Sequence, residues 1–348
     1  RLRLTLLHTN DHHGHDLDHP GPRGKGLVGG LGMRAALVET LRRAASTPDR
    51  RVLLLDVGDF STGPCPATRL QARSSLAGMD RLGYDAVAIG NHEFDQPLPT
   101  LLGELARITF PVLSATARWR ESSELLLPAQ HDLELAGRRV AILALTTPET
   151  PATSTLGDDP RLRFDDTVAT ARQWVARLRP ERDLLIVLSH QGLLPDLELA
   201  RQVPGIDVLV GGHSHDTLPE PVREGETLIL QAGDNGRFLG RAELELGPDR
   251  TVRLLDYELL PVPAAGEGAL QPSPEVEVPT RQLWQTMERA CLAPVGRASS
   301  RFERTPLQGP GTGSTLAHLV ADSLRWRGRT QLALQNEGGL RDDLPAGN

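Results

Sequence analysis

The chain alternates between short apolar runs and polar, glycine-containing connections, a pattern typical of α/β proteins. Five of the apolar runs predict buried strands, at residues 2–8, 51–57, 84–89, 183–188 and 206–210. Amphipathic stretches predict helices at residues 29–46, 70–82, 101–106, 164–178 and 195–202. In open α/β sheets, ligands bind beyond the carboxyl ends of the strands, so we expect a site in the loops that follow the five runs.

Other apolar segments predict further strands outside this series. They lie at residues 111–114, 130–145, 227–231, 239–246 and 252–259, and the second of them holds two strands around a turn. The last three segments alternate and are joined by turn residues, so they predict antiparallel strands of a second sheet.

The composition of residues 261–274 predicts a domain boundary, because this segment is rich in proline, glycine and alanine. A linking helix is expected at residues 275–292, followed by a helix at 314–327 and a strand at 331–334. We therefore predict a first domain over residues 1–262, a linker with its helix over 263–293, and an incomplete second domain over 294–348.

Composition narrows the class of protein. The net charge of -7 argues against a nucleic acid polymer as partner. No apolar run approaches the ~20 residues that span a membrane. Cys65 and Cys291 are too few for a disulfide framework, although they allow one bridge. The chain opens directly on a predicted strand, without the features of a signal peptide, and both ends look cut. We expect a fragment of a longer, exported precursor.

The loops after the five predicted strands carry side chains that bind metals. Asp-x-His in the first loop and His-x-His in the last each place two side chains on one side of an extended segment. The candidate ligands in all five loops are Asp11, His13, Asp59, Asn91, His190, His213 and His215. Oxygen and nitrogen donors without thiolates suit two divalent ions that share one carboxylate. Two such ions, ~3.5–4 Å apart, would support phosphoester hydrolysis.

Each motif has a simpler interpretation when it is taken alone. Asn91 and its polar neighbours could form a turn, Asp59 could precede a helix, and His190 could be structural. The coincidence of five such loops at equivalent positions favours the metal site. His12, His15, Asp16 and His19 are expected to form a solvated loop instead.

The motifs Asp-x-His, Gly-Asp, Gly-Asn-His-Glu, His and Gly-His-x-His occur in the order of the calcineurin-like metallophosphoesterases, which the chain resembles. The segments HTNDHHGH, GYDAVAIGNHEFDQPL and GGHSHD are similar to those of the 5′-nucleotidase and UDP-sugar hydrolase family, and QNEGGLRDDL resembles the start of its C-terminal domain. The resemblance implies a four-layer α-β-β-α sandwich with two mixed sheets, followed by the start of a smaller α/β substrate-binding domain.

The resemblance also implies a role for each residue. One metal would be held by Asp11, His13, Asp59 and His215, and the other by Asp59, Asn91, His190 and His213, with Asp59 bridging. His92, paired with Asp95, would stabilise charge on the phosphoryl group and assist the leaving oxygen. A carboxylate three residues along can orient the ring and keep it protonated. Asn91, Asn336 and Arg341 would contact the substrate, since an arginine fork suits phosphate oxygens.

The expected reaction is release of phosphate from nucleoside 5′-monophosphates by metal-activated water that attacks phosphorus. UDP-sugars and 2′,3′-cyclic nucleotides are further expected substrates. The metals would be manganese or zinc, with cobalt or iron as alternatives, because the same ligands accept all four. The resemblance implies a periplasmic or extracellular location. A thiosulfohydrolase-type enzyme on the same core, and a non-catalytic binding protein of this fold, are the alternative functions.

Overall fold

The computed structural model describes residues 2–21, 26–45, 50–294, 296–304, 313–334, 340, 343–344 and 346–347. The chain divides into two compact units, Arg1–Glu288 and Arg289–Asn348. The predicted domain boundaries stay a prediction.

The first sheet of the larger unit is mixed. Its strands lie in the order β16 (Val252–Pro261), β15 (Phe238–Leu246), β1 (Leu2–Thr9), β4 (Arg50–Asp56), β5 (Ala86–Ala88) and β6 (Val112–Leu113). The four strands from β1 to β6 run parallel, whereas β15 is antiparallel to both of its neighbours. Helices α1 (Leu31–Ala44), α3 (Arg73–Leu82) and α4 (Leu98–Leu105) share a buried apolar cluster with this sheet.

The second sheet is also mixed. Its strands lie in the order β13 (Val222–Glu224), β14 (Thr227–Leu230), β12 (Val208–Gly211), β11 (Leu184–His190), β9 (Arg138–Thr146) and β8 (Gln130–Leu135). The four central strands are parallel and the two edge strands are antiparallel. Helices α6 (Thr167–Leu178) and α7 (Leu193–Gln202) pack on this sheet through a second apolar cluster.

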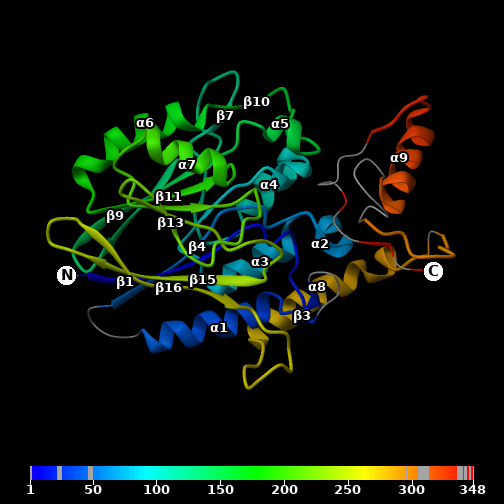
Figure 1. Ribbon diagram of the computed structural model, residues 1–348, viewed down its shortest axis with the longest axis horizontal. Coiled ribbons are helices and arrows are strands. Elements are labelled where there is room, and N and C mark those ends of the chain that lie inside the picture. The colour runs from blue at the N-terminus through cyan, green and yellow to red at the C-terminus, as the bar shows by residue number, and fades with distance from the viewer. Residues whose placement is uncertain are drawn as a thin grey trace. The chain divides into compact units, whose positions relative to one another are not determined.

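A third apolar cluster fills the space between the two sheets. It contains Leu6 and Leu55 from the first sheet and Ile142, Ile186 and Val210 from the second. Helices therefore cover the outer face of each sheet, with α6 and α7 on one side and α1 and α3 on the other (Figure 1). This arrangement confirms the predicted four-layer sandwich with two mixed sheets.

Shorter elements complete the larger unit. They are β2 (His19–Pro20), β3 (Leu27–Val28), α2 (Cys65–Arg69), η2 (His92–Asp95), β7 (Ala117–Trp119), α5 (Thr150–Thr153), β10 (Leu162–Phe164) and η3 (Arg179–Glu181). Helix α8 (Pro274–Cys291) packs through buried Val276 and Thr280. Both cysteines of the chain are disulfide-bonded.

The strands predicted to share a second antiparallel sheet do not do so, and that prediction was wrong. β14 lies parallel to β12 in the second sheet, whereas β15 and β16 extend the first sheet. The physical difference is visible in their burial. All of β14 is buried, as expected for an interior parallel strand, whereas β15 alternates between buried and partly exposed positions. The chain crosses from one sheet to the other between β14 and β15.

The boundaries of several helices also differ from the predictions. Helix α6 begins at Thr167 instead of residue 164, because Asp166 caps it by accepting a hydrogen bond from the Ala169 N–H at 2.7 Å. The predicted helix over residues 70–82 begins only at Arg73, as α3, because residues 70–72 form a turn after α2.

The smaller unit contains α9 (Thr315–Gly328), which confirms the predicted helix and is capped by the Ser314 hydroxyl. Residues 331–334 form no strand, contrary to prediction, and Leu334 is 84% exposed.

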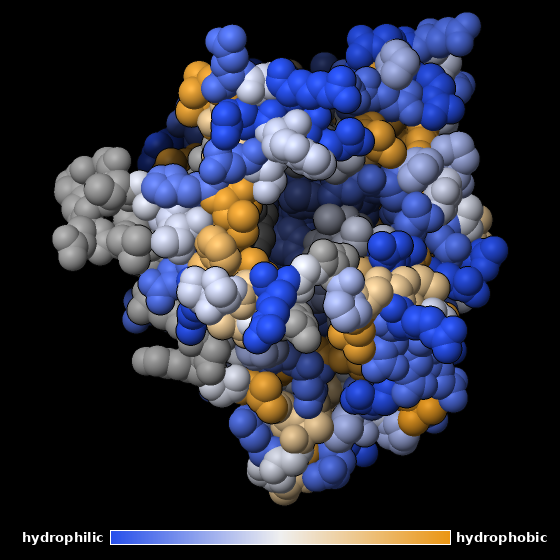
Figure 2. All heavy atoms as spheres, turned by 90° about the vertical axis from the view of Figure 1, so that its right-hand side faces the viewer, coloured by the Kyte–Doolittle hydropathy of each residue, from blue (hydrophilic) through white to orange (hydrophobic). Residues whose placement is uncertain are grey.

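On the face shown in Figure 2, hydrophilic residues predominate and hydrophobic residues form separate small groups. Among the described residues, no helix has the length and apolarity required to cross a membrane.

Candidate metal centre

The loops that carry the predicted ligands turn sharply as they leave their strands. Five of these ligands have a left-handed backbone, with φ of 50° at Asp11, 47° at His13, 54° at Asp59, 73° at His213 and 61° at His215. Such a conformation is uncommon outside glycine, and each instance costs about 1–3 kcal/mol. It persists only where surrounding contacts hold it, which makes these loops a candidate for function.

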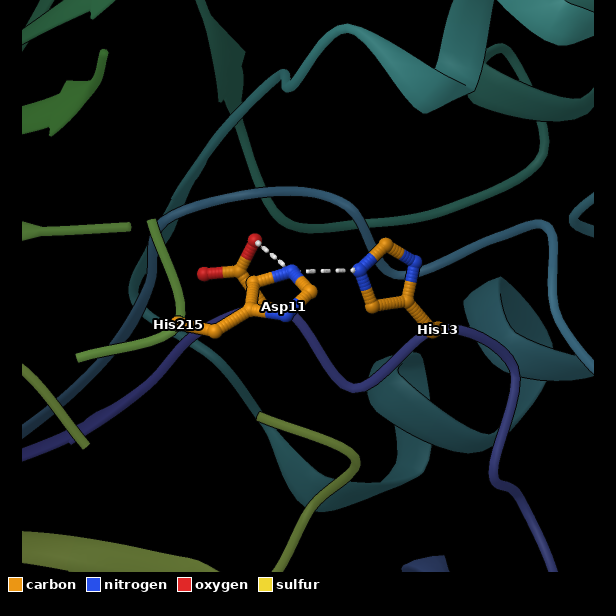
Figure 3. A group of neighbouring side chains, drawn as sticks. All are labelled: Asp11, His13 and His215. Carbon is orange, nitrogen blue, oxygen red and sulfur yellow. Dashed lines mark hydrogen bonds and ion pairs between the residues drawn. The ribbon is translucent and has the colours of Figure 1, made fainter. Parts of the chain in front are cut away.

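One group of side chains consists of Asp11, His13 and His215 (Figure 3). The Nε2 atoms of His13 and His215 lie 3.0 Å apart, and His215 Nε2 is 3.6 Å from Asp11 Oδ1. Asp11 and His13 follow β1 of the first sheet, whereas His215 follows β12 of the second. The group therefore joins the two sheets.

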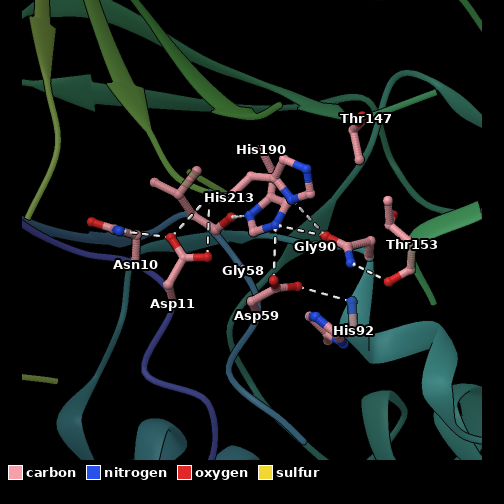
Figure 4. A network of polar contacts seen from close by, with 12 residues as sticks. Asn10, Asp11, Gly58, Asp59, Gly90, His92, Thr147, Thr153, His190 and His213 are labelled. Carbon is pink, nitrogen blue, oxygen red and sulfur yellow. Dashed lines mark hydrogen bonds and ion pairs between the residues drawn. The ribbon is translucent and has the colours of Figure 1, made fainter. Parts of the chain in front are cut away.

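A second group consists of Asp59, Asn91, His190 and His213 (Figure 4). His190 Nε2 lies 3.1 Å from both Asp59 Oδ2 and Asn91 Oδ1. His213 Nδ1 lies 2.9 Å from the same Asn91 oxygen. The Asn91 amide donates to the Thr153 carbonyl at 3.0 Å, which turns its oxygen toward the histidines. This group also combines both sheets, because Asp59 and Asn91 follow β4 and β5 while the histidines end β11 and follow β12.

Asp59 lies between the two groups. Its Oδ2 is 3.1 Å from His190 Nε2 in the second group and 4.0 Å from His13 Nε2 in the first. The structure thus brings all seven predicted ligands together, with Asp59 in the position expected of a shared carboxylate.

The ring orientations favour cation binding. His13 Nδ1 lies 3.2 Å from the Thr62 carbonyl, and His190 Nδ1 lies 2.7 Å from the Val57 carbonyl. Because a carbonyl can only accept, each Nδ1 carries a proton, so Nε2 is the ring nitrogen left to bind a metal. Converging imidazole nitrogens beside carboxylate oxygens are the donors that borderline divalent cations prefer, so the residues fit such metals.

The pKa values of several side chains in the two groups are strongly shifted. Burial raises the pKa of Asp11 to about 8. Burial would also raise the pKa of Asp59, but the neighbouring His190 holds it well below its usual range. Burial would lower the pKa of His190, and the Asp59 charge instead raises it to about 10. The buried charges compensate one another, and bound cations would perform the same role.

His92 and Asp95 form the predicted pair in η2. His92 Nδ1 lies 2.7 Å from Asp95 Oδ2, and the other Asp95 oxygen accepts from the Thr155 N–H at 2.6 Å. Burial lowers the pKa of His92, but the hydrogen bond to Asp95 and the charge of Asp59 outweigh it, so the pKa is raised. The His92 ring packs edge-on against His13, with centroids 5.3 Å apart, which places it beside both groups.

Glu93 was not predicted to belong to the site, yet it positions Asp59. This buried carboxylate accepts hydrogen bonds from the backbone N–H groups of Asp59, Gly90 and Ser61 at 2.9, 2.8 and 3.0 Å. Burial raises the pKa of Glu93 to about 7. The Asn-His-Glu motif was the available signal, but the contacts of Glu93 with the Asp59 loop could not be inferred from it.

The prediction of a solvated histidine-rich loop was wrong for His12 and Asp16, whereas His15 and His19 are partly exposed. His12 and Asp16 are fully buried. Asp16 accepts hydrogen bonds from the Ser74 and Ser75 hydroxyls at 2.6 and 2.8 Å, which attaches the loop to α3. Asn336 and Arg341, predicted to contact the substrate, lie outside the described residues.

Comparison with known proteins places the chain in a family. The calcineurin-like phosphoesterase family matches residues 4–217, a range that includes all seven predicted ligands. The chain belongs to this family of metal-dependent hydrolases, which act on phosphoric esters.

Within the family, the predicted resemblance to 5′-nucleotidases is confirmed. The chain is 28% identical to a 5′-nucleotidase of Vibrio vulnificus, over 99% of this chain and 69% of that protein. It is 27% identical to protein UshA of Escherichia coli, over 99% of this chain and 70% of that protein.

Solved structures of similar proteins have the same fold. A 5′-nucleotidase precursor from Thermus thermophilus superposes with a TM-score of 0.82 at 29% identity, covering 99% of this chain and 71% of that one. The sulfate thiohydrolase SoxB of the same genus has a TM-score of 0.79 at 20% identity, covering 94% and 68%, and it supports the fold alone.

Proposed function

We propose that this protein releases phosphate from nucleoside 5′-monophosphates at a centre that holds two divalent ions. The observation that carries the proposal is the convergence of seven ligands from five loops into two groups with Asp59 between them. The names of similar proteins, among them several 5′-nucleotidases, support the choice of substrate.

Each ion would have four protein ligands. Asp11, His13, Asp59 and His215 would hold one ion, and Asp59, Asn91, His190 and His213 the other. Manganese or zinc suits these donors, as do cobalt and iron. Divalent ions bound there lower the pKa of water and polarise the phosphoryl oxygens.

His92 would act on the phosphoryl group and the leaving oxygen. Asp95 engages Nδ1 at 2.7 Å, so Nε2 is the ring nitrogen that can donate to the substrate. The raised pKa favours the protonated form of the ring. A protonated imidazole can stabilise charge that develops on the phosphoryl oxygens and then transfer its proton to the departing alkoxide.

Substrate contacts beyond the centre are part of the same proposal. Arg341 and Asn336 would bind the substrate, and UDP-sugars and 2′,3′-cyclic nucleotides would be further substrates. An oxidising, extracytoplasmic location is supported by the disulfide-bonded state of Cys65 and Cys291, because disulfides persist mainly in such compartments.

The test is turnover of AMP, UDP-glucose and bis-(p-nitrophenyl) phosphate with added manganese. It compares the parent chain with His92→Ala and with the control His131→Ala, which removes a partly exposed histidine of β8. We expect hydrolysis of AMP that falls by about 10²–10⁴-fold in His92→Ala, the range for general acid–base groups, and is retained in the control. Failure to turn over any substrate with two metals bound would overturn the proposal.

A further inference from the structure

His215 differs from His13 and His190 in the chemical partner that its Nδ1 atom faces. His13 and His190 each donate Nδ1–H to a main-chain carbonyl. His215 Nδ1 instead lies 3.5 Å from Asp234 Oδ2, while its Nε2 faces Asp11 and His13. A carboxylate behind a ligand histidine fixes the orientation of the ring and increases its basicity toward a metal.

Asp234 is itself held in place. Its Oδ1 forms an ion pair with the Arg237 guanidinium, and the Arg237 N–H donates to its main-chain carbonyl at 3.1 Å. The guanidinium also lies over the Phe238 ring, 5.6 Å from the centroid. One carboxylate oxygen is thus fixed by an arginine and the other is directed at His215, an arrangement that limits rotation of the imidazole.

The loop that carries Asp234 also fixes the backbone of Asp11. The Asn235 N–H donates to the Asp11 carbonyl at 2.7 Å. Asn10 donates its side-chain amide to the Gly233 carbonyl at 2.6 Å and accepts from the Ala232 N–H at 2.8 Å. Residues 232–237 therefore support two members of the first group from a single loop between β14 and β15.

The second group has different supports. His190 is held by the Val57 carbonyl, and Asn91 by the Thr153 carbonyl. Neither of these contacts passes through the loop at residues 232–237. A change in Asp234 should consequently affect one group and leave the other as it is.

We propose that Asp234 is a positioning residue that sets the affinity of one divalent cation, the ion held by Asp11, His13 and His215. This inference rests on the proposed two-metal function. Asp234 touches neither the substrate nor the reacting atoms, and it acts through the orientation of His215.

The experiment is calorimetric titration of the metal-depleted protein with manganese. The variants are Asp234→Ala and the isosteric Asp234→Asn. The control is Asp256→Asn, which removes the carboxylate of another aspartate–arginine pair, on β16. His215→Ala and His190→Ala identify which binding event belongs to which group.

We expect two binding events in the parent chain. Asp234→Ala should weaken one of them by about 10–100-fold, the range for outer carboxylates, and it should be the event that His215→Ala removes. The other event should stay within about threefold of the parent value. Asp234→Asn should show a smaller loss, and Asp256→Asn none. Excess manganese should restore AMP turnover in Asp234→Ala, which a misfolded variant would not allow.

Equal weakening of both events, or of neither, in Asp234→Ala and Asp234→Asn would overturn the positioning role. So would weakening of the event that belongs to His190. A parent chain that binds fewer than two ions would instead contradict the two-metal function. The failure of the inference and the failure of the proposed function are thereby distinguishable.

Discussion

Two sets of buried histidines have different surroundings. In the metal centre, the Nδ1 atoms of His13 and His190 face main-chain carbonyls, and their Nε2 atoms lie near other predicted ligands. His8 and His12 are equally buried, but His8 Nδ1 and both nitrogens of His12 lack a hydrogen-bond partner among the described residues. Burial does not identify a functional histidine here, and neither does one nearby carboxylate, since His12 Nε2 lies 3.7 Å from Asp16 Oδ1. Convergence of several imidazole and carboxylate side chains does identify it.

The second set contributes packing at an energetic cost. His8 stacks on Tyr257 with centroids 6.0 Å apart, and a Cβ added to Gly240 would lie 2.0 Å from its ring. The imidazole therefore fills the space that Gly240 leaves open. A buried polar atom without a partner costs about 1–3 kcal/mol. In the metal centre the same kind of atom would bind cations under the proposed function.

The largest predicted effect follows from removal of Asp59, the carboxylate between the two groups of the metal centre. Asp59→Asn keeps the size of the side chain but removes the charge that lies between the groups. We expect loss of several kcal/mol of transition-state stabilisation, which is at least about 10³-fold in kcat/KM for AMP, with weaker binding of both ions. Metal content and turnover measure this, with Asp256→Asn as control. Retention of either ion at parent affinity would contradict the shared role.

Loosening the support of Asp59 should have a smaller effect. In Glu93→Gln, an amide NH₂ replaces one of two oxygens that accept backbone N–H groups, so at least one donor loses its acceptor. The expected loss of stability is about 1–3 kcal/mol. At about 2–4 °C per kcal/mol, thermal unfolding detects it. Glu258→Gln, on the partly exposed strand β16, is the control and should unfold like the parent. A parent-like melting temperature for Glu93→Gln would show that Asp59 does not need this support.

The effect predicted for His8 is small at neutral pH and grows as the pH falls. Burial lowers the pKa of His8 to about 3. Below the unfolded value of 6.5, the unfolded chain binds a proton that the folded chain excludes, so stability falls as the pH falls from about 6.5 toward 3. His8→Leu removes this dependence.

The measurement is denaturant unfolding of the parent and His8→Leu at pH 7 and pH 5. The parent should lose about 2 kcal/mol more than the variant between these pH values, because each pH unit contributes up to about 1.4 kcal/mol. Any constant difference in stability between the two proteins cancels in this comparison. Equal losses in both would mean that His8 becomes protonated within the folded protein.

Much of the metal centre could be predicted from the sequence because its signals are local. Asp-x-His and His-x-His are read within three residues, and each follows an apolar run that ends in a loop. The contacts of Glu93 with Asp59 and Ser61 could not be predicted, because they depend on how two separate loops meet. The burial of His12 and Asp16 was missed for the same reason, since Asp16, for example, accepts hydrogen bonds from Ser74 and Ser75 of α3, far along the chain.

In the fold, too, features encoded by neighbouring residues could be predicted, whereas pairings between distant strands could not. The parallel strands were evident from their apolar runs. The assignment of β14 and β15 to different sheets was not, because it depends on pairing with β12 and β1 far away in the chain. Alternation specifies which face of a strand is buried but does not specify the partner strand.

The origin of the ligands in both sheets has a thermodynamic consequence. Each group combines side chains that follow strands of the first sheet with side chains that follow strands of the second, so a bound ion ties the two halves of the sandwich together. Ions that bind the native state but not the unfolded chain stabilise it by about 1.4 kcal/mol for each tenfold excess over their dissociation constant. Cation supply would then govern how long the folded enzyme survives heating as well as whether it turns over.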